Sequence, residues 1–168
     1  MGESIIAFIS LIAIVVIVFI TTKLRKNQTP KYDERQEIVR GKAYKYAFFT
    51  MLIFGALYMY CSLFIESEFL LASVALMIDM FIGLVVYAVY SIWNDAFATI
   101  NGISKSYIIF LVCTVVLNLG NAIGTIKDGS IIANGTLTLD SISLVCAISL
   151  TIVLVTMLVK KLMNREAE

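Results

Sequence analysis

The chain has 168 residues, of which 60% are hydrophobic and 15% charged, and its formal net charge is +1. Soluble domains carry about 25% charged residues on average, so this composition argues against a water-soluble enzyme and favours an integral membrane protein. The chain has no histidine, and its three cysteines lack C-x-x-C spacing, so we expect no metal site, no cofactor and no nucleic-acid partner.

Five apolar runs are each long enough to cross the roughly 30 Å hydrocarbon core of a bilayer. They cover residues 5–22, 45–64, 70–92, 106–124 and 141–159. Each run should be an α-helix, because the backbone inside lipid must satisfy its own hydrogen bonds. Little sequence remains between the runs, so residues 1–168 are predicted to form a single integral membrane domain. The predicted fold is all-α, a transmembrane bundle of five helices.

The first run, residues 5–22, could be mistaken for a signal peptide. However, only Glu3 precedes it as a charge, so the basic segment of a signal peptide is missing. The run is also longer than the usual apolar core of such a peptide and lacks a small-residue cleavage site. We therefore expect a retained first helix.

The basic residues predict how the chain is threaded, because Lys and Arg favour the cytoplasmic side of spanning helices. Of the thirteen, eight lie between residues 23 and 45, three lie in the C-terminal tail, and the others are Lys105 and Lys127. If residues 23–45 are inside, twelve of the thirteen are inside. We therefore predict a multi-pass plasma-membrane protein with its N-terminus outside and its C-terminus inside.

The segment TPKYDERQEIVRGKAYKY, residues 29–46, is the most charged part of the chain. Thr29 can cap a helix and Pro30 suits the first helical position, so one helix is expected from about Pro30 to Phe64. Such a helix would be about 50 Å long, which exceeds the bilayer core by about 20 Å. The second helix is therefore predicted to extend into the cytoplasm.

This extension has two charged faces when its residues are placed at about 100° each. One face is basic and consists of Lys31, Arg35, Lys42 and Lys45. The other face is mixed and consists of Asp33, Glu37, Arg40 and Tyr44. Glu37 and Arg40 are spaced to form a pair. Because a basic face alone would set the topology, we expect the mixed face to bind a membrane or cytosolic protein. The alternatives are a solvated helix end that only sets topology, and a sensor of lipid headgroups.

The same segment carries a resemblance to a known group of proteins. The letters YDERQ at residues 32–36, followed by an Ala/Tyr-rich step into a span, resemble a pattern in small uncharacterised multi-spanning membrane proteins of Gram-positive bacteria. The resemblance covers about residues 31–50. It implies a bacterial cytoplasmic membrane and implies no activity.

Asp79 is the one ionisable residue deep inside a predicted span, ten residues into the run 70–92. A charge there costs about 2.5–3.5 kcal/mol on insertion scales, so Asp79 should face the bundle interior. Four-residue spacing places Ala75, Gly83 and Tyr87 on the same stripe, which suits close helix contact.

Polar and small residues also occur in the later spans. The fourth contains Asn118 and Asn121, and a G-x-x-x-G motif from Gly120 to Gly124. The third, fourth and fifth spans are therefore predicted to pack together. Asp79 is expected either to be protonated and hydrogen-bonded to Asn118 or a tyrosine, or to titrate or bind a cation during transport.

These observations favour a non-catalytic membrane protein, an accessory, regulatory or immunity-type subunit, that acts through a partner docked on the second helix. The alternative is a small transporter or channel subunit that uses Asp79, Asn118 and Asn121. No enzyme is expected, because an intramembrane aspartyl protease needs two deep carboxylates and a serine protease needs a base. Either function is compatible with an oligomer.

Overall fold

The computed structural model describes residues 32–64, 70–98, 105–133 and 135–166. The chain divides into two units, residues 1–31 and 32–168, and the described residues all belong to the second. The predicted first span, residues 5–22, therefore lies outside the described residues, as do Thr29 and Pro30.

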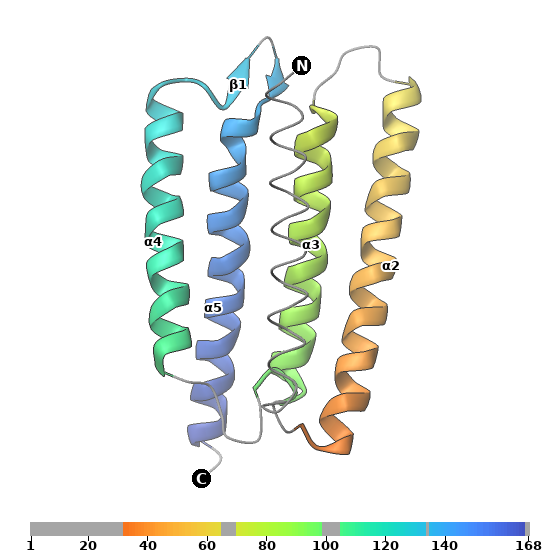
Figure 1. The fold of residues 1–168 in the computed structure, drawn as a ribbon, viewed down its shortest axis with the longest axis vertical. Coiled ribbons are helices and arrows are strands. Elements are labelled where there is room, and N and C mark those ends of the chain that lie inside the picture. The colour runs from red at the N-terminus through yellow and green to blue at the C-terminus, as the bar shows by residue number, and fades with distance from the viewer. Residues whose placement is uncertain (1–31, 65–69, 99–104, 134, 167–168) are drawn as a thin grey trace, which may run out of the picture. The chain divides into compact units, whose positions relative to one another are not determined.

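The second unit is mostly helical (Figure 1). Its helices are α2 (Glu34–Phe64), α3 (Ala72–Trp93), α4 (Lys105–Lys127) and α5 (Ile142–Glu166). The described part of the chain thus has four helices long and apolar enough to cross a membrane. They correspond to the second to fifth predicted runs and fit a multi-pass membrane protein.

The helices form a row in which α2 packs on α3, α3 on α5, and α5 on α4 (Figure 1). One buried cluster joins α3, α4 and α5 through Ala88, Ile92, Leu111 and Val153, as the predicted packing of these three helices requires. A second cluster, built on Leu70, Val74 and Ala75, includes Tyr58 of α2.

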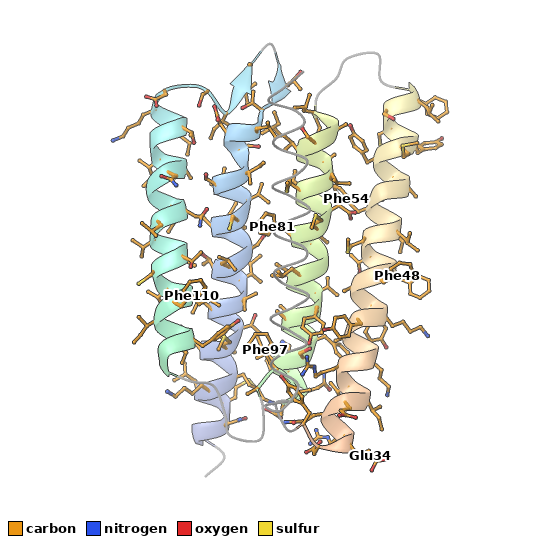
Figure 2. The ribbon with its side chains drawn as sticks, in the orientation of Figure 1. Glu34, Phe48, Phe54, Phe81, Phe97 and Phe110 are labelled. Atoms are coloured by element: carbon orange, nitrogen blue, oxygen red, sulfur yellow. The ribbon has the colours of Figure 1, made fainter. Side chains whose placement is uncertain are left out.

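Small residues bring these helices together, whereas many large apolar residues face outward. α2 buries only Ala43 and Ala47, one turn apart. Phe48 on α2 and Phe110 on α4 are 58% and 69% exposed (Figure 2). Small residues at helix contacts and large apolar residues outside are the arrangement expected of helices surrounded by lipid.

The connection between α4 and α5 contains a short β-hairpin. We call the end of the row where this connection lies the hairpin end. β1 (Ile132–Ala133) pairs antiparallel with β2 (Thr136–Leu137). Gly135 lies between them with a φ of 81°, which glycine adopts readily. Leu137 also forms an isolated bridge to Leu70. The all-α prediction omitted this hairpin, whose strands are too short to show an alternating pattern.

Between β2 and α5 lies η2 (Leu139–Ser141), a single turn of 3₁₀ helix. The Thr138 hydroxyl donates to the main-chain oxygen of Ser130 at 2.6 Å, and the Ser141 hydroxyl donates to that of Thr138 at 2.7 Å. These local bonds fix the path of the chain from the hairpin into α5.

Candidate functional site at the charged end of α2

The block Asp33-Glu34-Arg35-Gln36 caps the N-terminus of α2. The main-chain N–H of Gln36 donates to Asp33 Oδ1 at 2.6 Å, and the main-chain N–H of Asp33 donates to Gln36 Oε1 at 3.3 Å. This reciprocal pair is a capping box, which satisfies two of the main-chain donors that a helix start leaves free.

The expected helix start at Pro30 is therefore wrong, because α2 begins at Glu34. The first helical main-chain bond runs from Glu37 N–H to the Asp33 oxygen at 3.0 Å, so Asp33 is the N-cap. The physical reason is the spacing of polar side chains. Asp33 has a glutamine three residues later, whereas Thr29 has Tyr32 at that position and cannot form the same box.

Gln36 also joins the start of α2 to the end of α3. Its Nε2 donates to the main-chain oxygens of Asp95 at 2.9 Å and Ala98 at 3.3 Å. Its side-chain amide therefore acts at both ends, since the oxygen completes the cap of α2 and the nitrogen binds the connection that follows α3.

The C-terminus of α3 is shaped so that it can accept this contact. Asp95 has a φ of 56°, the left-handed conformation that Asp tolerates better than most side chains. The N–H of Asp95 donates to the Ile92 oxygen at 3.2 Å, and the N–H of Ala96 donates to the Ser91 oxygen at 2.8 Å. These two bonds form a Schellman motif, which ends α3 and turns the chain toward Gln36.

Lys160 of α5 binds the same turn. Its Nζ lies 3.1 Å from Asp95 Oδ2 and donates to the main-chain oxygen of Trp93 at 3.0 Å. A lysine at this position also suits the negative end of the α3 dipole. We call this region, where the start of α2, the end of α3 and α5 meet, the charged end.

Arg40 lies one turn further along α2, among tyrosines. Its Nε donates to the Tyr87 hydroxyl of α3 at 3.1 Å, and its guanidinium carbon lies 3.8 Å from the centroid of the Tyr32 ring. The rings of Tyr44 and Tyr87 are 4.5 Å apart. We call Arg40, Tyr32, Tyr44 and Tyr87 the Arg40 cluster.

The four residues of the predicted mixed face have different roles in the structure. Asp33 caps α2, while Arg40 and Tyr44 are brought together against Tyr87. Within the described residues, Glu37 forms no ion pair with Arg40, because the guanidinium turns toward α3 instead. Glu37 is exposed, and its carboxylate accepts no hydrogen bond among the described residues.

Asp79 lies on a stripe of α3 that faces α2. At Gly83 an added Cβ would come within 2.7 Å of Met51 Cγ, and Tyr87 binds Arg40. Asp79 lies one turn before Gly83. Its Oδ1 is buried and has no hydrogen-bond partner in the part of the chain that the structure describes. The hydrogen bond expected from Asn118 or a tyrosine is therefore not formed there.

The two asparagines of α4 are not joined to Asp79. Asn118 Nδ2 donates to the Thr114 oxygen of its own helix at 2.8 Å, and Asn121 is exposed. A Cβ added at Gly120 or Gly124 would meet nothing within 4 Å. The G-x-x-x-G motif therefore mediates no close contact with the described residues.

Three contact residues were not identified from the sequence, namely Gln36, Asp95 and Lys160. The capping box could have been found from the Asp33–Gln36 spacing alone. Asn94-Asp95 is a polar pair directly after an apolar run, which is a common signal for a helix end. Nothing in the sequence indicates that Lys160 pairs with Asp95, since 64 residues separate them in the chain.

The comparisons with known proteins do not assign the chain to a family. No protein-family model matches it, and no curated protein or solved structure matches it significantly. Its function must therefore be inferred from its own residues and their geometry.

Proposed function

We propose that this protein is a non-catalytic integral membrane protein, an accessory, regulatory or immunity-type subunit, that acts through a protein partner docked on the cytoplasmic extension of α2. The charged end supports this proposal. Exposed residues of both signs, among them Glu34, Glu37 and Lys42, lie on a helix start that Gln36 holds in place. A surface that is already ordered loses less conformational entropy when a partner binds.

The proposed threading places the charged end in the cytoplasm of a bacterial cell. Residues 5–22 would form a fifth span, with the N-terminus outside and the C-terminus inside. The contacts support this arrangement, because Asp95 binds both Gln36 of α2 and Lys160 of α5. The start of α2, the end of α3 and the last turns of α5 therefore lie at one end, as this threading requires.

Crosslinking in native membranes, followed by mass spectrometry, tests the docking proposal. Glu37→Lys should abolish capture of the partner, because it reverses the charge of a mixed-face residue whose side chain has no hydrogen bond or ion pair among the described residues. Asp128→Lys is the matched control, since it makes the same charge change at an exposed position of the hairpin end. If Glu37→Lys and Asp128→Lys capture the same proteins as the natural chain, the docking proposal is wrong.

Charge reversal at Arg40 is a poor test of docking, because it would also break the contact with Tyr87. Glu37→Gln is better as a second variant. It removes the exposed charge and adds no cation near the positive end of the α2 dipole. Its capture of the partner should be weakened, while its thermal stability should stay close to that of the natural chain.

A second candidate function is a small transporter or channel subunit, and Asp79 supports it. A buried carboxyl oxygen without a hydrogen bond is costly, and such groups occur more often at functional sites. Asp79→Asn in proteoliposomes should abolish proton or cation flux measured with an indicator dye, while partner capture is unchanged. Unchanged flux in this variant would exclude the transport function.

A further inference from the structure

Arg40 carries a positive charge that no acid balances within the described residues. Its Nε donates to the Tyr87 hydroxyl, and no carboxylate lies within ion-pair distance of it in this part of the chain. Glu37, the acid nearest on its own face, is exposed and does not pair with it. A guanidinium has five N–H donors, so the groups on Nη1 and Nη2 have no carboxylate acceptor here.

The Arg40 cluster holds this guanidinium in a defined orientation. The Tyr32 ring covers one face of the group at 3.8 Å, and the Tyr87 hydroxyl accepts the hydrogen bond from Nε. Tyr44 packs against Tyr87 from the same helix as Arg40. Stacking on an aromatic face leaves the in-plane N–H donors free, and these fit the paired oxygens of a phosphate. Arg40 is only half-buried, so an anion can reach it.

The position of the cluster along the helices indicates what kind of anion it meets. Tyr44 stacks on Tyr87, and Tyr46 lies 5.0 Å from Tyr90 in an edge-on contact. Tyrosines are enriched where a spanning helix passes from hydrocarbon to headgroups, so these two pairs mark that boundary on α2 and α3. Arg40 lies four residues before Tyr44, about 6 Å further from the hydrocarbon, at the depth of lipid phosphates.

We propose that the Arg40 cluster binds the phosphate of an anionic phospholipid in the cytoplasmic leaflet. The guanidinium donates from Nη1 and Nη2 to two phosphate oxygens. The Tyr87 hydroxyl accepts from Nε and so keeps the guanidinium turned toward the phosphate. Exposed basic residues on the opposite face of α2, such as Lys42, attract anionic lipid in general, but no cation–π contact orients them among the described residues.

The test uses the purified full-length protein in mild detergent, with bound lipids counted by native mass spectrometry. Phosphatidylglycerol is titrated against phosphatidylcholine, which carries the same phosphate but no net charge. The natural chain should retain phosphatidylglycerol preferentially. Arg40→Gln should lower its affinity at least about tenfold, because it removes the charge and the paired hydrogen bonds from Nη1 and Nη2. The matched control is Arg35→Gln, which removes the same charge from an exposed arginine and should change the affinity less than about twofold.

Two further variants keep the proposal testable if Arg40→Gln does not fold. Arg40→Lys keeps the charge but loses the planar fork, and it should lower the affinity severalfold. Tyr87→Phe keeps the ring against Tyr44 but removes the hydroxyl, and it should have a smaller effect of the same sign. Circular dichroism and a monodisperse elution profile show whether each variant is folded.

Three results would overturn the proposal. Equal losses in Arg35→Gln and Arg40→Gln would mean that charge alone attracts the lipid. Equal retention of the two lipids would exclude a site selective for anionic lipid. Displacement of phosphatidylglycerol by excess inorganic phosphate would show that the cluster binds free phosphate. None of these results depends on a protein partner, so they leave the docking proposal to its own test.

Discussion

The two outer helices of the described row, α2 and α4, are attached to their neighbours in different ways. α2 approaches α3 closely where Met51 lies over Gly83, and it is joined to other elements by hydrogen bonds from Gln36 and Arg40. α4 packs on α5 through apolar residues such as Leu111. The side-chain hydrogen bonds recorded for described residues of α4 end on main-chain oxygens of α4 itself.

This difference shows what fixes a helix in an apolar surrounding. Burial of large apolar side chains does not distinguish a neighbouring helix from lipid, so such contacts do little to fix the rotation and height of a helix. Hydrogen bonds and a glycine contact are directional, and they fix both the rotation and the height of α2. The charged start of α2 is thus held at one position on α3, which both the docking and lipid proposals need.

The largest expected loss of stability comes from adding a side chain at Gly83, where α3 contacts Met51 of α2. Gly83→Val should destabilise the protein by about 1–3 kcal/mol, because the new side chain overlaps Met51. Thermal unfolding in detergent, followed by circular dichroism, measures this loss.

Gly120→Ala is the control, since an added Cβ there meets nothing within 4 Å. It should leave stability unchanged or raise it by up to about 1 kcal/mol through helix propensity. Equal losses in the Gly83 and Gly120 variants would contradict the difference between the two outer helices.

The next largest loss of stability is expected at Gln36, which completes the capping box of α2 and binds the α3–α4 connection. Gln36→Ala removes both functions and should cost about 1–2 kcal/mol. Gln36→Glu is a sharper variant, because it can keep the capping box but can no longer donate to Asp95 and Ala98. Hydrogen exchange should then rise at residues 95–98 in both variants, but at Asp33, whose N–H loses its acceptor, only in Gln36→Ala. Unchanged exchange at residues 95–98 would mean that Gln36 does not hold this connection.

A smaller effect is expected at the hydrogen bond from Arg40 to α3. Tyr87→Phe keeps the ring against Tyr44 and should cost about 0.5–1.5 kcal/mol. Tyr90→Phe is the matched control, because the ring of Tyr90 contacts Tyr46 and no hydrogen bond from its hydroxyl is recorded among the described residues. If thermal unfolding shows the same shift for both variants, the hydroxyl of Tyr87 adds nothing to the attachment of α2.

The smallest effect is expected at Lys160. The side chain of Asp95 is 54% exposed, so the ion pair is screened by water and salt. Lys160→Met should cost no more than about 1 kcal/mol at low salt. The loss should shrink as salt is raised, because only the ion pair is screened. A loss that does not depend on salt would assign the contribution to the hydrogen bond with Trp93.

The sequence predicted the helices far better than their contacts. The run 70–92 corresponds to α3 at Ala72–Trp93, and 106–124 to α4 at Lys105–Lys127, because hydropathy reports directly on span length. α5 continues to Glu166, beyond the run 141–159, because a helix can continue in water after its apolar residues end. The stripe with Gly83 was also identified. A single helix face, however, does not indicate which helix it meets, and the partner proved to be α2.

The candidate site was predicted only in part for a related reason. The mixed face was found from residue spacing, but spacing within one helix favoured a Glu37–Arg40 pair. In the structure Arg40 instead donates a hydrogen bond to Tyr87, which is 47 residues away in the chain. Contacts between helices depend on how each helix is rotated about its axis and where it lies along its neighbour. The periodic pattern of one segment specifies neither of these.

Asp95, in its left-handed turn, contacts both helices that flank α3, namely α2 and α5. Its main-chain oxygen binds α2 through Gln36, and its carboxylate binds α5 through Lys160. Glycine at this position would keep the turn and the main-chain acceptor, and would relieve the conformational cost of a side chain at positive φ. Asp95→Gly would therefore remove the ion pair with Lys160 of α5 and keep the hydrogen bond from Gln36 of α2, so the turn would no longer couple the polar contacts of the two helices that flank α3.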